Sequence, residues 1–284
     1  MKHTYDDLVD KGLGFALATL GRRQMLRALG LGVVAVGMAA CGSSPSSAAT
    51  SVGEIPDETA GPYPGDGSNG PNVLTDSGIV RSDIRSSFGA ASGRAEGVPM
   101  TLELTLTDIA GGGKPFAGAA VYVWHCTREG EYSLYSPTVR DENFLRGVQI
   151  ADAAGAVRFT SVFPGCYSGR WPHVHFEVYP DQAGIADAGT AIATSQVALP
   201  QAACEQVYAQ SGYQASVANL ARLSLASDNV FGDDGGARQL AETTGDASTG
   251  YAVALAVAVD TTTAPAMGGP GDGGLPADGP RPPG

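Results

Sequence analysis

The chain has 284 residues and a formal net charge of −12, from 29 acidic and 17 basic side chains. This length suits one large domain or two small ones. A surface this acidic argues against nucleic acid or an anionic membrane surface as the natural partner. Glycine is frequent at 40 residues, and 43% of the residues are hydrophobic. The composition therefore favours an all-β domain with long loops, little helix and a sizeable core.

The N-terminal segment, residues 1–40, has the features of an export signal. Arg22 and Arg23 precede an uncharged apolar run over 28–40, which is shorter than the roughly 20 residues that a membrane-spanning helix needs. The paired arginines resemble a twin-arginine signal. Cys41 then stands where a lipobox cysteine would be acylated. We expect an exported protein that is anchored through Cys41 or secreted, with an ordinary signal peptide and an incidental cysteine as the alternative.

The remainder of the chain divides into three parts. Residues 41–56 are small and polar and predict a flexible tether. Residues 57–260 form the folded domain, in which we find no internal repeat and no sign of a second domain. Residues 261–284 hold six prolines and seven glycines, so we expect a disordered tail.

Short apolar segments between turns predict the strands of this domain. Over 100–107, Met and Leu alternate with Thr and Glu, which is the pattern of a half-buried strand. Residues 143–149 are ambiguous, and 205–210 are compatible with a short helix. Further strands are expected at 119–126, 157–163, the second half of 163–179, 193–199 and 251–260. Strands at this spacing predict a β-sandwich.

The stretch FPGCYSGRWPHVHFEVY, residues 163–179, gives the clearest chemical signal. His173 and His175 are two positions apart on a predicted strand, so both imidazoles project to the same side and form half of a metal site. Glu177 lies on that face as well. A site of two histidines and one carboxylate for ferrous iron is therefore one possibility.

Two tyrosines offer a different set of ligands. Tyr132 lies in the loop after the 119–126 strand, and Tyr167 lies in the Pro-Gly turn before the histidines. A single loop tyrosine is normally a packing anchor. Ferric iron is hard and highly charged, however, and can lower the pKa of a bound phenol so that the phenolate coordinates at neutral pH. Two phenolates and one hydroxide would neutralise an Fe(III) ion that two neutral imidazoles also bind.

Three cysteines remain after the signal segment: Cys126, Cys166 and Cys204. An exported protein can oxidise its thiols, and three thiols allow one disulfide. A bridge from Cys166 to either of the others would help to fix the loop of Tyr167, and the sequence does not choose the pair. A Cys/His zinc site is disfavoured because the chain has no C-x-x-C pair.

Several motifs occur in the order found in the intradiol ring-cleavage dioxygenases, and the chain resembles that family over about residues 57–200. The motifs are ETAGPY (58–63), VWHC (123–126), GEY (130–132), FLRG (144–147), FPGCY (163–167) and RWPHVH (170–175). The chain is similar to the catalytic domain of the catechol and protocatechuate 3,4-dioxygenases, and most similar to the exported, single-chain branch of the family.

The resemblance implies a prealbumin-like β-sandwich, an Fe(III) cofactor and O₂-dependent opening of a catechol-type ring to a muconic acid-type product. It makes Tyr132 and His173 equatorial ligands of the iron, and Tyr167 and His175 axial ligands. It also gives Tyr167 a catalytic role, since this phenolate would take up a proton of the substrate. The expected partners are a small catechol and O₂, while the choice of catechol and the oligomeric state stay open.

The resemblance assigns roles to two further residues. Arg170 matches the arginine that stabilises the developing anionic intermediate, and Gln196 matches a glutamine that lines the substrate pocket. His125 matches no ligand of the family, so we interpret it as a core or supporting residue.

A non-catalytic binding module is the alternative from a different class. Residues 115–121, 152–155 and 163–167 also resemble the prealbumin-like β-sandwich of such modules. Those segments encode strands and turns rather than chemistry. They give no reason for Arg170 followed by the PHVH of 172–175.

Overall fold

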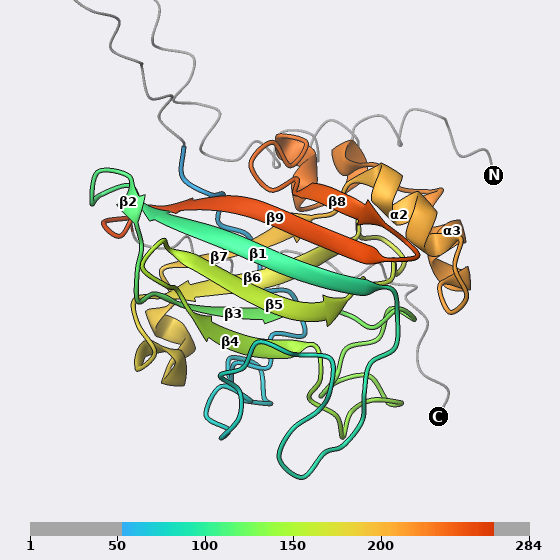
Figure 1. The fold of residues 1–284 in the computed structure, drawn as a ribbon, viewed down its shortest axis with the longest axis horizontal. Helices are drawn as coiled ribbons and strands as arrows, with labels where there is room; N and C mark the ends of the chain where they lie inside the picture. The colour runs from blue at the N-terminus through green and yellow to red at the C-terminus, as the bar shows by residue number, and fades with distance from the viewer. Residues whose placement is uncertain (1–52, 264–284) are drawn as a thin grey trace, which may run out of the picture. The chain divides into compact units, whose positions relative to one another are not determined.

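The computed structural model describes residues 53–263. The predicted signal segment with Cys41, most of the predicted tether and residues 264–284 of the predicted tail lie outside the described residues. Residues 53–263 form two β-sheets that pack face to face (Figure 1). The predicted all-β class is confirmed. None of the helices within 53–263 has the length and apolar character needed to cross a membrane.

The first sheet has five strands. β1 pairs antiparallel with β2 and β5 and parallel with β9, which in turn pairs with β8. Along β1 buried residues alternate with more exposed ones, as the 100–107 pattern predicted, and most of β9 alternates in the same way. The bounds are β1 Pro99–Asp108, β2 Lys114–Pro115, β5 Ala156–Val162, β8 Glu242–Asp246 and β9 Gly250–Val259.

The second sheet has four antiparallel strands in the order β4-β3-β6-β7. Every residue of β3 and of β6 is buried. The ambiguous segment 143–149 contributes the edge strand β4. The bounds are β3 Ala120–Trp124, β4 Arg146–Ile150, β6 His173–Tyr179 and β7 Ala193–Ala198.

Helical structure follows the second sheet. The helix expected at 205–210 is α2, Gln201–Tyr208, and it begins earlier because Pro200, with its fixed φ, stands at the N-cap. The sequence patterns did not predict α3, Gln214–Leu220, or strand β8, whose residues are mostly exposed. The remaining turns are the 3₁₀ segments η3 Gly184–Ala186, η4 Ala188–Thr190, η5 Leu225–Ser227 and η6 Phe231–Asp233.

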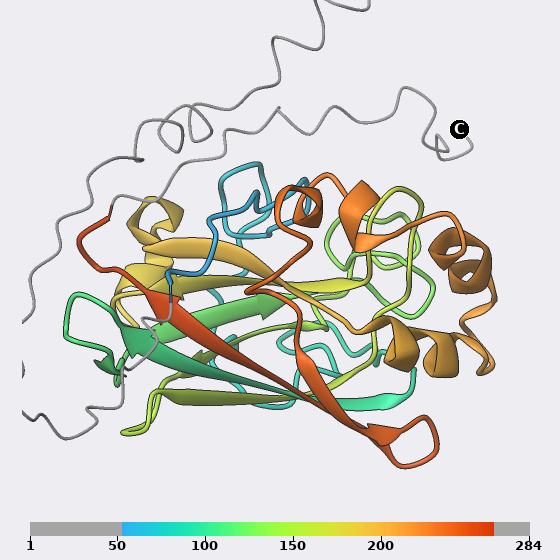
Figure 2. The same cartoon turned by 90° about the horizontal axis from the view of Figure 1, so that it is seen from above.

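The main core lies between the sheets. Leu102 and Leu104 of β1 meet Val123 of β3 and Phe176 of β6 in one buried cluster. The other face of the four-stranded sheet supports a second cluster, which includes Trp124. The segment before β1 and the segment between α3 and β8 lie on this same side of β6 and β7 (Figure 2). This face is therefore an interior lined by loops.

Both predicted domain boundaries shift by a few residues. The predicted tether extends to residue 56, but Ile55 is 3% exposed and its N–H donates to Ala258 O of β9 at 2.8 Å. The folded domain therefore begins before residue 57. Beyond β9, residues 261–263 form a turn in which Thr263 Oγ1 donates to Glu54 Oε1 at 2.7 Å.

Candidate metal centre

Four side chains from separate parts of the sequence meet over the outer face of β6. The Nε2 atoms of His173 and His175 are 3.0 Å apart, Tyr167 Oη is 3.3 Å from His173 Nε2, and Tyr132 Oη is 3.4 Å from Tyr167 Oη. Atoms that each lie about 2.1 Å from one metal ion, at 90–120° to one another, are about 3.0–3.6 Å apart. The spacing of these four donors therefore suits a single metal ion.

Strand β6 fixes the two histidines. His175 pairs with Trp124 of β3 and Gln196 of β7, so its ring sits in the middle of the sheet and stacks on the Trp124 indole at 4.9 Å and 5°. His173 Nδ1 is hydrogen-bonded to the carbonyl of Trp171. Because a carbonyl only accepts, that bond places the proton on Nδ1 and leaves the lone pair of His173 Nε2 for a ligand.

The loop between β3 and β4, which supplies Tyr132, contains two residues in a strained conformation. Leu134 and Leu145 both have positive φ, at 71° and 57°, and they are the only non-glycine residues within 53–263 that do. Such conformations cost on the order of 1–3 kcal/mol each and persist where surrounding contacts impose them. Tyr132 itself is 2% exposed, and its N–H donates to Ser136 Oγ at 2.9 Å.

Arg146 helps to hold the loop of Tyr132 in this conformation through hydrogen bonds to Ser133. It follows Leu145 at the start of β4, is 1% exposed, and donates to Ser133 Oγ at 3.0 Å and Ser133 O at 2.9 Å. It also donates to the carbonyls of Tyr63 at 3.0 Å and Pro64 at 2.6 Å. Arg146 thus ties the loop of Tyr132 to the N-terminal segment, whose Tyr63 ring packs 4.8 Å from that of Tyr132.

Close backbone approach joins the loops of the two tyrosines. Gly165 N–H donates to Thr127 O at 2.9 Å, and a Cβ at Gly165 would lie 2.4 Å from Arg128 O. Gly130 has a φ of +92°, and a Cβ there would lie 3.2 Å from Cβ of Tyr167. Glycine is required at both places, so the Pro-Gly turn and the Gly-Glu-Tyr segment form one unit.

Burial sets the protonation of the four donors. Burial lowers the pKa of His173 to about 3, and the charge of Arg170 lowers it further. Burial also lowers the pKa of His175 well below its usual value, and the neighbouring His173 adds to this shift. Burial also raises the pKa of Tyr132 and of Tyr167 above the usual value of a phenol. The imidazoles are therefore neutral ligands, and only a strongly charged cation would hold both phenols as phenolates.

Glu177 does not join the donors. Its Oε2 accepts a 2.7 Å hydrogen bond from Tyr179 Oη, two positions farther along β6. Throughout 53–263, no three His, Cys, Asp or Glu side chains form a group that could hold a metal ion. The set that the structure brings together is two histidines and two tyrosines.

Arg170 lies beside the donors and is held from two sides. Its Nη2 donates to Gln196 Oε1 at 2.7 Å, and its Nε donates to Asp228 Oδ2 at 3.0 Å. Gln196 is fully buried, and its Nε2 donates to Thr59 O at 2.9 Å. Both polar atoms of Gln196 are used within the protein, so it supports Arg170.

Asp228 and Phe231 are neighbours of the site that the sequence patterns did not single out. Both come from the segment between α3 and β8, which has no apolar periodicity. The Phe231 ring lies 6.4 Å from the His173 ring, and Arg170 Cζ lies 6.0 Å from the Phe231 centroid. The one available signal was Ser224-Leu-Ala-Ser-Asp228, which is rich in turn-forming and capping residues.

Comparison with known proteins shows what the region around these residues is similar to. The family model described as Dioxygenase (Dioxygenase_C) matches residues 70–175, which include all four donors and Arg170. The chain is 31% identical over 88 residues to the chlorocatechol 1,2-dioxygenase of Rhodococcus opacus, covering 24% of this chain and 34% of that protein. It is 36% identical over 90 residues to catechol 1,2-dioxygenase 1 of Acinetobacter lwoffii, covering 25% and 29%. Over this region the chain is similar to the intradiol ring-cleavage dioxygenases.

The fold agrees with that similarity. The solved structure of an intradiol ring-cleavage dioxygenase from Tetranychus urticae superposes with a TM-score of 0.58 at 22% identity, over 75% of this chain and 97% of that one. At that identity the likeness concerns the fold. The matched part of the chain spans about a third of the length of the curated relatives.

The remaining histidine and the cysteines lie in the interior of this intradiol dioxygenase fold. His125 Nδ1 is 2.8 Å from Cys126 O and its Nε2 is 2.7 Å from Ser161 Oγ, so both nitrogens have partners in the core. Cys126, Cys166 and Cys204 are buried and free. The disulfide that we considered for the loop of Tyr167 is not formed, and the glycine contacts described above hold that loop.

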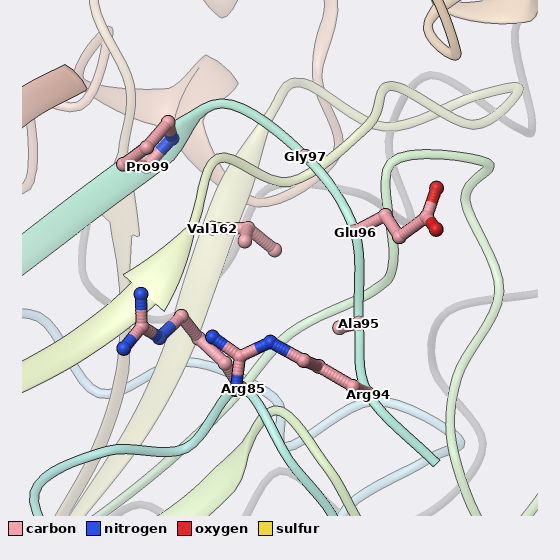
Figure 3. A pocket seen from close by; sticks show the side chains of 7 residues that line it. All are labelled: Arg85, Arg94, Ala95, Glu96, Gly97, Pro99 and Val162. Atoms are coloured by element: carbon pink, nitrogen blue, oxygen red, sulfur yellow. The ribbon is translucent and has the colours of Figure 1, made fainter. Parts of the chain in front are cut away.

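A cavity of about 380 Å³ lies elsewhere, between the segment before β1 and the end of β5. It is lined by Arg85, Arg94, Ala95, Glu96, Gly97, Pro99 and Val162 (Figure 3). Its charged side chains already have partners: Arg85 pairs with Asp83, Arg94 donates to Ser86 Oγ, and Glu96 pairs with Arg128. None of the four metal-donor residues lines it.

Proposed function

We propose that this protein is a non-haem, Fe(III)-dependent intradiol dioxygenase. It would use O₂ to open the ring of a catechol-type aromatic between the two hydroxylated carbons, giving a muconic acid-type product. The main support is the meeting of Tyr132, Tyr167, His173 and His175 within contacts of 3.0–3.4 Å. The match to the Dioxygenase family model and the catechol 1,2-dioxygenases among the relatives support the same reaction.

The chemistry of the donors suits ferric iron. Phenolate oxygens are hard ligands, and imidazole nitrogens also suit iron. Two buried phenolates are costly without a compensating charge, and a trivalent cation offsets that cost better than a divalent one. His175 Nδ1 is buried without a hydrogen-bond partner within residues 53–263. The orientation of the His175 ring therefore depends on its stacking on Trp124 and on a bond to a metal at Nε2. When bound, Fe(III) would make the catechol dianion accessible at neutral pH and provide the redox centre for O₂.

Tyr167 would handle a proton of the substrate. It is the more exposed of the two tyrosines, and its Oη lies between Tyr132 Oη and His173 Nε2. Burial raises the pKa of Tyr167 above its usual value, so a phenolate at this position is a strong base. It is therefore suited to accept the proton that a catechol hydroxyl loses on binding.

Arg170 would stabilise negative charge that develops on the substrate. Its side chain is 14% exposed, and its charge acts on the donors, since it contributes to the lowered pKa of His173. A fixed cation in a site shielded from water interacts with developing charge far more strongly than one in solvent. The ring of Phe231 lies close to this region, 6.0 Å from Arg170 Cζ and 6.4 Å from the His173 ring.

Colour tests the metal assignment. Iron-loaded protein should be red to brown, since charge transfer from phenolate to Fe(III) absorbs visible light. Tyr132→Phe and Tyr167→Phe should each weaken the absorption, and the double variant should abolish it. Tyr135→Phe is the matched control, because Tyr135 lies in the same loop and its hydroxyl contacts Gly65 N and Asn69 Oδ1 instead of the donors.

Two results would contradict the proposal. Iron-replete protein without colour, or colour that survives the double tyrosine change, would exclude phenolate ligands. Loss of iron binding in Glu177→Gln would favour a carboxylate ligand in their place. A non-catalytic binding module would show neither colour nor oxygen uptake. Oxygen consumption with catechol, protocatechuate, hydroxyquinol and larger catechols would then define the substrate.

We also propose that the protein is exported and anchored to the membrane by a lipid on Cys41. The basis is the sequence alone: the paired Arg22 and Arg23, the apolar run over 28–40 and the cysteine after it. Cys41→Ser should move the protein from the membrane fraction to the soluble exported fraction, and replacing both arginines by lysine should keep it in the cytoplasm. Unchanged fractionation of both variants would refute the proposal.

A further inference from the structure

A buried carboxylate holds Arg170 from outside the region matched by the family model, which ends at residue 175. The side chain of Asp228 has no exposed surface. Its Oδ2 accepts hydrogen bonds from Arg170 Nε at 3.0 Å and from Trp171 N at 2.6 Å. Its Oδ1 lies 3.4 Å from Arg170 Nη2 and accepts from Val230 N at 2.9 Å. One carboxylate therefore joins the Arg170 loop to the turn that leads into η6.

These bonds also keep Asp228 charged. Burial by itself raises the pKa of Asp228, but the charge of Arg170 and the N–H of Trp171 outweigh burial, and the pKa lies below its usual value. A buried carboxylate that accepts several N–H bonds and faces a guanidinium is a strong, directional partner.

The contacts of Arg170 select one orientation of its guanidinium. Asp228 engages Nε, Gln196 engages Nη2 at 2.7 Å, and Thr59 O in turn holds the amide of Gln196. Among the described residues nothing bonds to Nη1, so this end of the fork keeps both N–H donors for a bound molecule. An arginine side chain without such partners would adopt many rotamers, so its charge would have no fixed position.

We propose that Asp228 is a positioning residue, which holds Arg170 so that its Nη1 faces the substrate space beside the donors. The proposal rests on the proposed function, because it assigns Arg170 to charge stabilisation during ring opening. Stabilisation of this kind requires donors that are already in place, and a misplacement of about 1 Å can reduce the rate by about 100-fold. Asp228 acts through Arg170 and does not touch the four metal donors.

A double-mutant cycle tests the pair in the iron-loaded, full-length protein. Asp228→Asn should lower kcat for catechol by about 10- to 100-fold, with little change in KM, iron content or visible absorption. In an Arg170→Gln background the same substitution should have no further effect on kcat. Asp246→Asn is the control, since Asp246 accepts backbone bonds from Ser248 and Thr249 in the exposed β8–β9 turn.

A second readout is independent of the reaction. In metal-free protein, NMR of the arginine Nε–H groups should show slow hydrogen exchange for Arg170, identified by the loss of its signal in Arg170→Gln. Asp228→Asn should speed this exchange at least tenfold. Asp228→Ser keeps an oxygen for the turn N–H groups and provides the same test where the Asn variant does not fold.

The outcomes separate the two proposals. Unchanged exchange at Arg170, an equal loss of kcat with and without Arg170, or loss of iron from Asp228→Asn would each overturn the role of Asp228. Coloured wild-type protein that consumes no oxygen with any catechol would instead overturn the proposed reaction. In that case slow exchange that depends on Asp228 would still establish the contact.

Discussion

The two sheets treat their outer faces differently. In the five-stranded sheet, β1 and β9 alternate buried and exposed residues, and the outer face meets solvent. In the four-stranded sheet, β3 and β6 are buried at every position. The outer face of β6 nevertheless has polar residues, His173, His175 and Glu177. Loops must cover this face and supply polar partners to it. The site forms where these loops bring Tyr132, Tyr167 and Asp228 to the polar residues of β6 and their neighbour Arg170.

Two arginines show the consequence. Arg146 on the covered face is 1% exposed and donates five hydrogen bonds to loop atoms and neighbouring side chains. Arg158 on the solvent face of β5 pairs with Glu103 of β1, and its side chain is 71% exposed. Water cannot replace the hydrogen bonds of the buried Arg146. The exposed pair of Arg158 contributes little to stability, because water solvates both groups when the pair is broken.

The largest expected effect is on the inner face of the four-stranded sheet. Phe176→Ala removes a fully buried ring from the core between the sheets, so we expect the free energy of unfolding to fall by about 3–5 kcal/mol. Urea denaturation measures the change. Since Phe176 points away from the donors, the visible absorption per folded, iron-loaded molecule should not change. Loss of colour in folded protein would show that the two faces are not independent.

Arg146→Met should have a somewhat smaller effect on stability and a larger one on the site. It leaves the carbonyls of Tyr63 and Ser133 without donors and removes one of the two donors to Pro64 O, so we expect a loss of about 3 kcal/mol in the free energy of unfolding. It should also weaken iron binding, because the loop of Tyr132 loses its anchor. Urea denaturation and metal titration measure the two effects. Stability lost without any change in iron affinity would separate Arg146 from the placement of Tyr132.

Glu58 should make stability depend on pH. Burial raises its pKa to about 7, with Asp233 and Asp234 adding to the shift and Arg170 and Gln239 opposing it. The folded state therefore binds the proton more tightly than the unfolded state, so this contribution to stability is complete below about pH 4.5 and is lost as pH rises to about 7.

Glu58→Gln should remove that dependence. One group contributes at most about 1.4 kcal/mol per pH unit, and Glu58 contributes less because it is only partly buried. Unfolding in urea at several pH values between 4.5 and 7.5, for wild type and variant, measures the difference. Identical pH profiles would contradict the raised pKa of Glu58.

The smallest effect is expected on the solvent face of the five-stranded sheet. Arg158→Met breaks the exposed pair with Glu103, and we expect a change of at most about 1 kcal/mol in the free energy of unfolding. This variant is also the matched control for Arg146→Met, since both replace an arginine on a strand. A loss comparable to that of Arg146→Met would remove the distinction between the two faces.

Local patterns in the sequence predicted much of the fold. Alternation over two residues located β1, because strand side chains alternate between faces whatever the strand pairs with, and β9 was expected from an apolar segment. The same rule placed His173 and His175 on one face, and the strands β3, β5 and β7 followed from apolar segments between turns. Strand β8 and helix α3 were not predicted, because their residues are mostly exposed and show no apolar periodicity.

The candidate site divides in the same way. Tyr167, Arg170, His173 and His175 lie within nine residues, so the local motif is enough to distinguish them. Tyr132 was assigned through a resemblance, and the pairing of β3 with β6 brings its loop to the histidines. The placement of Gln196 against Arg170 and Thr59 depends on β7 lying beside β6, so its orientation could not be predicted from local sequence.

Contacts between neighbours along the chain account for the strand periods and for the shared face of His173 and His175. The anchoring of the Tyr132 loop by Arg146, and the contact of Asp228 with Arg170 across 58 residues, come from the packed domain. A buried polar group needs a partner, but it does not specify where in the chain that partner lies. Packing of the whole domain makes that choice.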